Sequence, residues 1–242
     1  MIKPSALPRY KRVLLKLGGE GLAGKATFGI DPDVVNEIAE DIIAVKNLYN
    51  TQFAIVVGGG NIIRGDVASK RGMDRLTADY KGMLGTVINA LALQDVLERV
   101  GVDTRVMTAI RMESVAEPYI RRRATRHLEK GRLVIFAGGT GNPFFSTDTA
   151  GVLRALEVDA EVILKATNVD GIYTADPKKD PSAKLIPELT YHDAIVNNYA
   201  VMDGNAFGLC RANQLPIIVF NINQPRAVAR VLQGERVGTI VR

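Results

Sequence analysis

Three clusters of glycine follow short apolar runs in this sequence, and their positions point most directly to chemistry. They are Gly18-Gly19, Gly58-Gly59-Gly60 and Gly138-Gly139-Thr140-Gly141. Glycine lets backbone N–H groups approach a phosphate closely, and a helix that begins nearby adds a favourable dipole. Glycine also ends many strands simply to form a turn, which would explain one cluster. Three clusters at successive strand ends favour phosphate binding.

Basic side chains beside these clusters could neutralise phosphate charge. Lys16 and Lys165 each lie at the end of an apolar run, and Arg64 follows the second cluster. An arginine there can hold two phosphate oxygens at once. Phosphoryl transfer needs mainly such positioning, with cations around the developing negative charge. The alternative for each residue is an ordinary surface charge or a lysine that extends from a strand end into water.

The elements that would position these residues alternate between strand and helix. Apolar runs predict strands over residues 12–17, 53–57, 104–107, 132–137, 160–165, 216–220 and 238–241. Helical spacing and capping signals predict a helix that begins at Asp31-Pro32 and further helices over 77–100, 117–130, 148–157 and 225–232. This alternation predicts a parallel sheet covered by helices on both faces, whose ligands bind at the carboxyl ends of the strands. Because no linker or internal repeat interrupts it, residues 1–242 are expected to form a single α/β domain.

Composition limits the class of protein. Hydrophobic residues make up 47% of the 242 residues and charged residues 24%, which excludes a disordered or low-complexity chain. Cys210 is the only cysteine, so the chain cannot form an intramolecular disulfide, and a reducing cytoplasmic location is expected. The first residues do not resemble a signal peptide, and no apolar stretch is long enough to span a bilayer. Neither export by that route nor a membrane-spanning segment is expected.

The net charge of +5 favours an anionic partner. Aromatic residues are only 6% of the chain and tryptophan is absent, which argues against a base-stacking surface for nucleic acid. Arg121-Arg122-Arg123 and Arg126 could form a basic patch, but on a helix these four side chains cannot all share one face. A solvated surface is therefore expected there. His127 and His192 stand alone, without metal-ligand spacing, and are expected at the surface; no metal site built from protein ligands is predicted.

Two familiar phosphate-binding loops can be excluded. Residues 19–25 match the P-loop pattern as far as Lys25, but Ala26 stands where the magnesium-binding Ser or Thr should be. The residues that follow, 27–32, cannot begin the helix that a P-loop requires. A G-x-G-x-x-G fingerprint after the first strand is also missing, which argues against an NAD enzyme.

Taken together, the motifs resemble the amino acid kinase superfamily and, within it, the bacterial uridylate (UMP) kinases. The segments that carry the resemblance occur in the family's order over nearly the whole chain: 16–20 (KLGGE), 58–65 (GGGNIIRG), 75–79 (RLTAD), 139–148 (GTGNPFFSTD) and 165–177 (KATNVDGIYTADP). The GTGNPFF run is specific to the UMP branch, whereas the glycine triplet and the run 169–177 are shared more widely. The resemblance implies a three-layer αβα sandwich around a mainly parallel sheet, a homohexamer, and transfer of the ATP γ-phosphoryl group to UMP in pyrimidine nucleotide synthesis.

The resemblance also implies roles for individual residues. Those expected to take part in catalysis are Lys16, Arg64, Asp148 and Lys165, with Asp148 orienting Lys16 as well as capping a helix. Those expected to contact ATP are Lys16, Leu17, Gly18, Gly19, Gly60, Arg64, Thr167, Asn168, Tyr173 and Asp176. Those expected to hold UMP are Gly59, Asp79, Thr140, Gly141, Asn142, Pro143, Phe144, Phe145, Ser146 and Thr147. The carboxylate of Asp79 can accept hydrogen bonds from both ribose hydroxyls.

Cofactor and effectors follow from the same resemblance. Mg²⁺ is expected with ATP. Phosphates and water are expected to provide most of its ligands, since no pair of carboxylates in the sequence stands out as a ligand set. GTP is expected to activate and UTP to inhibit. The segment that matches the family's GTP-linked region is Gly24, Lys25, Ala26, Thr27, Phe28 and Gly29. One position departs from the family: Gly18 replaces the usual serine, so a hydroxyl contact to phosphate is lost while the backbone N–H is kept.

The rival hypothesis within the superfamily is a kinase of a carboxylate or carbamate, such as glutamate or aspartate. The segment 142–145 and Asp79 argue against it, because both serve a nucleotide acceptor. From a different class, a nucleic-acid-binding regulator would depend on the arginines at 121–126 and on binding that falls steeply with salt.

Overall fold

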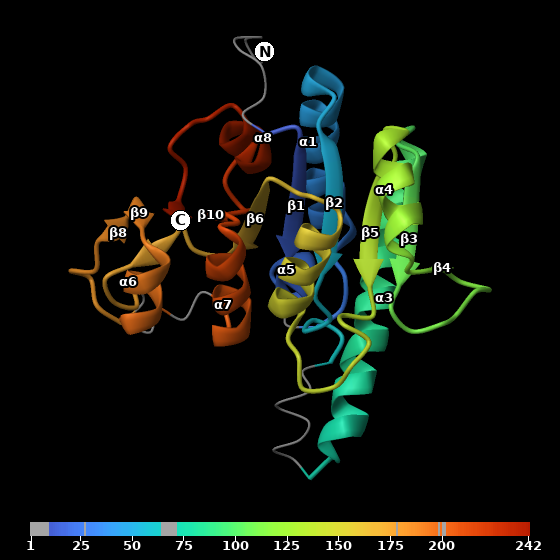
Figure 1. Cartoon of the computed structure of the whole chain (residues 1–242), viewed down its shortest axis with the longest axis horizontal. Helices are drawn as coiled ribbons and strands as arrows, with labels where there is room; N and C mark the ends of the chain where they lie inside the picture. Colours follow the sequence, from blue (N-terminus) through green and yellow to red (C-terminus); the bar gives the residue numbers. More distant parts are fainter. Residues whose placement is uncertain (1–9, 27, 64–71, 178, 198, 200–201) are drawn as a thin grey trace.

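A mostly parallel sheet forms the centre of the molecule (Figure 1). The computed structural model describes residues 10–26, 28–63, 72–177, 179–197, 199 and 202–242. Within these residues nine strands pair in the order β4-β3-β5-β2-β1-β6-β10-β11-β9. Every neighbouring pair is parallel except β10 and β11, which are antiparallel. The strands are β1 (Arg12–Leu17), β2 (Gln52–Val57), β3 (Thr104–Thr108), β4 (Glu117–Pro118), β5 (Leu133–Ala137), β6 (Val162–Thr167), β9 (Glu188–Leu189), β10 (Ile217–Asn221) and β11 (Thr239–Val241).

Helices cover both faces of this sheet, as the alternation of elements predicts. One face packs against α1 (Pro32–Tyr49), α3 (Arg75–Arg99) and α8 (Ala227–Leu232), and the other against α4 (Arg121–Glu129), α5 (Thr147–Glu157), α6 (Tyr191–Val196) and α7 (Gly204–Asn213). The side chains of β1 alternate between the two cores: Val13 and Leu15 pack on the α1 side, whereas Leu14 packs on the α5 side. This period of two is the reason a fully apolar strand can serve two helical layers. The fold is the αβα sandwich that the sequence predicts.

The central strand β1 lies where the direction of chain progression reverses. It pairs with β2 on one side and with β6 on the other, although β6 comes much later in the sequence. Open α/β sheets bind ligands outside the carboxyl ends of the strands at such a point. The register places Lys16 of β1 directly beside Lys165 of β6. The two lysines singled out in the sequence therefore become neighbours.

The helix starts explain how the loops leave the sheet. Asp31 caps α1 by accepting a hydrogen bond from the N–H of Asp33 at 3.0 Å, and Pro32 occupies the first turn. Between β1 and α1 the described residues form a short 3₁₀ turn, η1 (Gly19–Leu22), and no α-helix. The glycine loop thus does not run straight into an α-helix, in agreement with the exclusion of a P-loop.

Two predicted helix starts are wrong. The predicted helix 117–130 begins only at Arg121, because Glu117 and Pro118 pair with β3 as strand β4. A residue before proline avoids the helical conformation, which explains the extended backbone at Glu117. The predicted helix 225–232 begins at Ala227 because Arg226 has a left-handed backbone (φ 54°) that no regular helix contains.

Several short elements between β6 and β10 carry no clear sequence signal. They are the hairpin of β7 (Ile172–Tyr173) and β8 (Leu185–Ile186), together with β9, α6 and α7. Their strands have only two residues each, too short for periodicity to reveal them. None of the helices in the described residues has both the length and the apolar character needed to cross a membrane.

Candidate active site

Three charged side chains meet at the carboxyl end of the central strands. The Lys16 ammonium lies 2.9 Å from Oδ1 of Asp148, and the Lys165 ammonium pairs with Oδ2 of the same carboxylate. The three side chains are only 9–14% exposed. Asp148 reaches this position from the first turn of α5, where Ser146 caps the helix by accepting hydrogen bonds from the N–H groups of Asp148 and Thr149. One carboxylate thus holds both lysines in place.

The electrostatics of this trio follow from its depth and its charges. Burial by itself raises the pKa of Asp148, but the ammonium groups of Lys16 and Lys165 outweigh that effect and hold its pKa below the ordinary value. Burial lowers the pKa of Lys165, and the neighbouring Lys16 adds to the effect, while Asp148 opposes it. With both lysines protonated, the trio has a formal charge of +1.

Lys16 lines a first cavity, here called the β1 cavity. Its volume is about 490 Å³. The lining comes from the first glycine loop, the glycine triplet and the end of β6: Lys16, Leu17, Gly18, Gly19, Glu20, Gly21, Leu22, Ile38, Gly58, Gly59, Gly60, Thr147, Ala166, Thr167, Asn168 and Ile222. Seven of the residues predicted to contact ATP, namely Lys16, Leu17, Gly18, Gly19, Gly60, Thr167 and Asn168, therefore lie around one space.

A second cavity, the α3 cavity, adjoins the first. It has a volume of about 400 Å³ and is lined by Glu20, Gly59, Gly60, Ile63, Ala78, Asp79, Gly82, Met83, Thr86, Gly139, Thr140, Phe145, Ser146 and Thr147. Glu20, Gly59, Gly60 and Thr147 line both cavities. Six residues predicted to hold UMP lie around this second space: Gly59, Asp79, Thr140, Phe145, Ser146 and Thr147. The two cavities share a wall beside the charged trio.

Asp79 anchors the loop that covers the α3 cavity. Its two carboxylate oxygens accept from Nε of Arg75, each at 2.9 Å, and Oδ2 also accepts from the N–H of Phe144 at 2.8 Å. The Arg75 guanidinium lies over the Phe144 ring, 5.6 Å from its centroid. Phe144 is 65% exposed and adopts a left-handed backbone (φ 69°) that is costly for an aromatic residue. The loop after β5 is thus held in a strained shape by one carboxylate.

Other predicted residues lie outside both cavities. Gly141, Asn142, Pro143 and Phe144 belong to the same covering loop but do not line the α3 cavity. Tyr173 and Asp176 lie in and after β7, away from the lining of the β1 cavity. Arg64 lies outside the described residues, as does Thr27 in the predicted effector segment.

The remaining residues of the effector segment lie on the loop between β1 and α1. Gly24, Lys25, Ala26 and Phe28 are exposed, Phe28 by 70%. Gly29 is tied to the glycine triplet: its N–H donates to the carbonyl of Asn61 at 2.9 Å, and its own carbonyl accepts from Nδ2 of Asn61 at 2.7 Å. The segment is therefore bonded to the loop that forms the wall between the cavities.

The two glycines of the first loop differ in how much space surrounds them. A β-carbon on Gly19 would lie 2.5 Å from Oδ1 of Asn61 and 2.7 Å from the backbone nitrogen of Gly60, so no larger residue fits. A β-carbon on Gly18 would meet no atom within 4 Å. The serine that the family usually has at this position would fit, so its loss here is not imposed by space.

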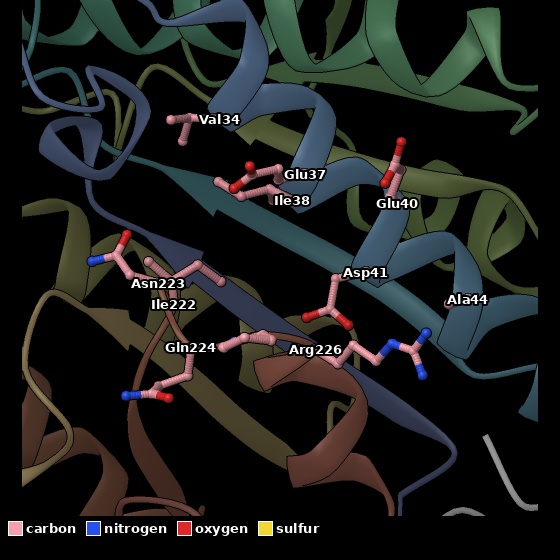
Figure 2. A pocket seen from close by; sticks show the side chains of 11 residues that line it. Val34, Glu37, Ile38, Glu40, Asp41, Ala44, Ile222, Asn223, Gln224 and Arg226 are labelled. Atoms are coloured by element: carbon pink, nitrogen blue, oxygen red, sulfur yellow. The ribbon is translucent and has the colours of Figure 1, made fainter. Parts of the chain in front are cut away.

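A third cavity is lined by none of the residues predicted to belong to the site (Figure 2). With about 510 Å³ it is slightly larger than the other two, and it lies between α1 and residues 222–226. It shares Ile38 and Ile222 with the β1 cavity. The Asp41 carboxylate accepts from the N–H groups of Val228 and Ala229 and so caps α8 from another helix, beside Arg226. These contacts satisfy two N–H groups in the first turn of α8.

The basic helix α4 is arranged as helical geometry requires. Arg122, Arg123 and Arg126 gather with His127 around an open hollow, whereas Arg121 turns away to Asp159, 3.3 Å distant. The four arginines thus do not share one face, as predicted. His192 is exposed, whereas His127 is half-buried at the hollow: its side chain is 14% exposed, and Nε2 lies 3.2 Å from Glu117.

Sequence reasoning missed several residues of the site. Asp203, which caps α7, accepts hydrogen bonds from the hydroxyls of Ser146 and Thr149 and so ties the start of α5 to a later helix. Glu20 stands within the KLGGE motif yet was given no role, although it lines both cavities. Thr86 and Met83 had no signal beyond helical spacing. In the described part of the chain, no group of three or more His, Cys, Asp or Glu side chains is placed to hold a metal.

Comparison with known proteins places this geometry in a family. A model of the amino acid kinase family matches residues 11–221. The chain belongs to the amino acid kinase family. This membership and the observed sheet confirm what the motifs predict.

Three solved structures of similar chains are UMP or uridylate kinases. The UMP kinase from Bacillus anthracis is 45% identical, with a TM-score of 0.93 over 96% of each chain. The UMP kinase from Ureaplasma parvum is 37% identical, with a TM-score of 0.90 over 96% of this chain and 99% of that one. The uridylate kinase from Archaeoglobus fulgidus is 28% identical, with a TM-score of 0.74 over 95% of this chain and 99% of that one.

Proposed function

We propose that this protein is a UMP kinase: it transfers the γ-phosphoryl group of ATP to UMP and releases ADP and UDP. Residues 1–242 act as one domain, in the cytoplasm, within pyrimidine nucleotide synthesis. The observation that carries the proposal is the pair of cavities that share a wall at Gly59, Gly60, Glu20 and Thr147 beside the Lys16–Asp148–Lys165 trio. A direct transfer needs two substrates side by side, with cations where their phosphates meet.

The β1 cavity is the proposed donor site. Backbone N–H groups of Gly18 and Gly19 lie at the end of β1 and can bind the ATP phosphates. Lys16 bridges the donor and acceptor phosphates and stabilises the negative charge of the transferring group, while Lys165 adds positive charge. Asp148 takes no proton, because its pKa stays below the ordinary value; it holds both ammonium groups in position.

Part of the proposed donor site lies beyond the cavity lining. From Thr167 and Asn168, which line the cavity, the chain continues to Tyr173 and Asp176. We assign Tyr173 and Asp176 to the adenosine part of ATP. Tyr173 offers a flat face for the base and Asp176 accepts hydrogen bonds. Arg64, outside the described residues, is assigned to phosphate binding.

The α3 cavity is the proposed acceptor site. Asp79 faces it, and its carboxylate oxygens have acceptor capacity beyond the bonds from Arg75 and Phe144, so they can bind the ribose hydroxyls of UMP. The other proposed contacts are Gly59 and the loop Thr140, Gly141, Asn142, Pro143, Phe144, Phe145, Ser146 and Thr147.

Mg²⁺ is the proposed cofactor. It neutralises phosphate charge when it is bound with ATP. The described residues contain no group of three or more His, Cys, Asp or Glu side chains that could hold a metal ion, so phosphate oxygens and water form most of its proposed ligand set. Glu20, which lines both cavities, is the proposed protein ligand.

A stripe of exposed apolar side chains supports the proposed homohexamer. Leu76, Tyr80, Leu84 and Ile88 recur every fourth residue along α3 and are 45–48% exposed. This spacing puts them on one side of the helix, whose first turns extend beyond the sheet (Figure 1). A self-complementary helix face of this kind suits pairing between identical subunits. GTP as activator and UTP as inhibitor complete the proposal, with residues 24–29 as the segment that responds to GTP.

The experiment that tests the function measures ATP-dependent ADP release with a panel of acceptors: UMP, CMP, dUMP, glutamate, aspartate and carbamate. Turnover confined to UMP is the expected result. Activity with an amino acid or carbamate and none with UMP would keep the fold but replace the proposed acceptor.

Replacement of Asp79 tests the acceptor site within the proposed reaction. Asp79→Asn should raise the KM for UMP about 10-fold or more, because the amide nitrogen cannot accept a hydrogen bond from a ribose hydroxyl. The KM for ATP should change little. The two constants are measured by varying one nucleotide at a saturating level of the other. Equal changes in both would remove Asp79 from the ribose site.

A further inference from the structure

Two uncharged polar side chains of α3 are buried in the protein interior. Asn89 is fully buried and Thr86 is 1% exposed. Leucine or valine at these helical positions would add apolar packing without the need to satisfy polar groups. Buried polar side chains are retained at little cost only where every group finds a partner. Their partners therefore indicate what they do.

Thr86 fixes the start of the loop after β5. Its hydroxyl donates to the carbonyl of Met83 at 2.6 Å and accepts from the N–H of Gly138 at 2.7 Å. Gly138 has a left-handed backbone (φ 75°) and begins the loop that contains the residues proposed to hold UMP. One hydroxyl thus sets the point from which that loop leaves the sheet.

Asn89 fixes the glycine triplet through a reciprocal pair of side-chain amides. Its Nδ2 donates to the carbonyl of Gly58 at 2.7 Å and to Oδ1 of Asn61 at 2.6 Å, and its Oδ1 accepts from Nδ2 of Asn61 at 3.0 Å. Asn61 is itself 1% exposed and also donates to the carbonyl of Gly29. The amide pair therefore ties α3 to both ends of the triplet and to the segment before α1.

The same pair sets the position of the first glycine loop. Oδ1 of Asn61 lies only 2.5 Å from the position that a β-carbon of Gly19 would occupy. The N–H of Gly58 donates to the carbonyl of Leu17 at 2.8 Å. The glycine loops after β1 and β2 are thus packed on each other and supported from behind by Asn89.

We propose that Thr86 and Asn89 are positioning residues with separate duties: Thr86 aligns the acceptor loop, and Asn89, through Asn61, aligns the donor loops. This inference rests on the proposed function, since it assigns the two duties to its two substrates. Misplacement of a substrate by about 1 Å can cost about 100-fold in rate, so a buried hydrogen bond behind a loop can matter as much as a direct contact.

The test compares Thr86→Val and Asn89→Leu, which remove the polar groups but fill the same space. Thr86→Val should raise the KM for UMP about 10-fold and leave that for ATP within about twofold. Asn89→Leu should lower kcat about 10- to 100-fold and raise the KM for ATP. Thr86→Ser, which keeps the hydroxyl, should restore the KM for UMP. If Asn89→Leu does not fold, Asn89→Asp replaces it in the test. Aspartate keeps the size of the side chain but lacks the amide donor, so the same fall in kcat and rise in the KM for ATP are expected.

Thr104→Val is the matched control. Thr104 is also fully buried, and its hydroxyl donates to the carbonyl of Val102 at 2.9 Å, but it lies at the amino end of β3, opposite the glycine loops. It should lower the melting temperature without changing kcat or either KM. If Thr86→Val and Asn89→Leu behave like this control, or shift both KM values equally, the separate positioning roles are wrong.

The outcome remains informative if UMP is not the acceptor. No turnover of UMP by the wild-type chain would overturn the proposed function, and the affinity for MgATP, measured by calorimetry, would then test the positioning. Weaker binding to Asn89→Leu than to Thr86→Val would support the role of Asn89. Equal binding to both variants would overturn it.

Discussion

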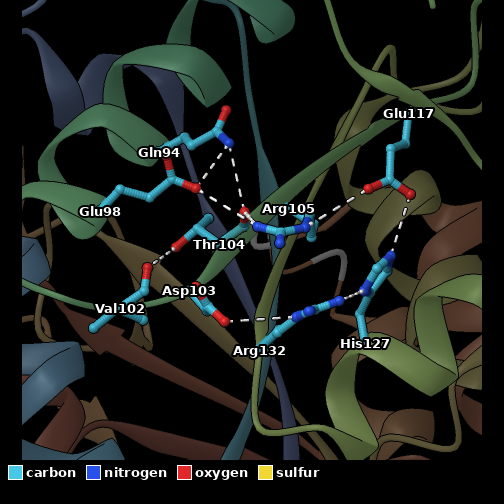
Figure 3. A network of polar contacts seen from close by, with 9 residues as sticks. All are labelled: Gln94, Glu98, Val102, Asp103, Thr104, Arg105, Glu117, His127 and Arg132. Atoms are coloured by element: carbon cyan, nitrogen blue, oxygen red, sulfur yellow. Dashed lines mark hydrogen bonds and ion pairs between the residues drawn. The ribbon is translucent and has the colours of Figure 1, made fainter.

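Two clusters of charged and polar side chains differ in depth, and depth decides what each can do. The central trio of Lys16, Asp148 and Lys165 is 9–14% exposed and lies between α5 and the middle strands. The second cluster joins α3, β3 and α4 at the edge of the sheet (Figure 3). There the Arg105 guanidinium lies 3.7 Å from Glu98 and 3.8 Å from Glu117, and these carboxylates are 44% and 36% exposed.

The contrast shows why the number of ion pairs says little about function. In the edge cluster water screens each pair, so any member can be neutralised at small cost. In the trio, removal of Asp148 leaves two buried ammonium groups without a counter-charge. Lys16 of the trio also lines the β1 cavity, whereas no residue of the edge cluster lines the β1 or the α3 cavity.

Loss of Lys16 is expected to have the largest effect. Lys16→Ala should lower kcat about 100- to 1,000-fold, because the lysine acts on charge that develops in the transition state. Asp148 keeps Lys165 as a partner, so the fold should survive, as circular dichroism and gel filtration can check. Turnover within a few-fold of the wild type would place the trio with the edge cluster as a structural feature.

Loss of Asp148 should reduce both stability and rate. Asp148→Asn leaves two buried ammonium groups without a counter-charge and should cost about 3–5 kcal/mol of unfolding free energy. Because the pKa of Asp148 in the folded protein lies below its ordinary value of 3.8, its stabilisation is present above that pH and is lost as the pH falls through the folded-state pKa.

Urea unfolding of both proteins from pH 3 to 7 measures this contribution. The stability difference between wild type and Asp148→Asn should stay constant above about pH 5 and shrink at lower pH. A difference that is small and independent of pH would mean that the trio is as weakly coupled as a surface pair.

Loss of Glu98 should have the smallest effect. Glu98→Gln removes one charge from the edge cluster but keeps the size of the side chain, and the unfolding free energy should change by less than about 1 kcal/mol. Both kcat and the two KM values should stay at wild-type levels. A large fall in activity would show that the edge cluster is coupled to the site and would weaken the comparison.

Much of this arrangement could be predicted from the sequence because its signals are local. Apolar runs that end in glycine located the central strands to within a few residues, and Asp31-Pro32 marked the start of α1. The errors also have local causes: Pro118 keeps Glu117 in a strand, and the left-handed Arg226 delays α8. Strands β7, β8 and β9 were missed because two-residue strands have no periodicity. The helices α6 and α7 were missed although Thr190 and Asp203, two residue types that favour the N-cap position, stand at their starts.

The sequence by itself determined the family, the strand ends and the lysines at them, since residue type and spacing are enough to specify these. Only the tertiary structure decided that Lys165 lies beside Lys16, because the register between β1 and β6 joins segments far apart in the chain. The burial of Thr86 and Asn89 behind the glycine loops was likewise invisible, because a polar residue on a helix gives no sign of which side faces the core. Long-range packing, not local preference, turns these scattered residues into one site.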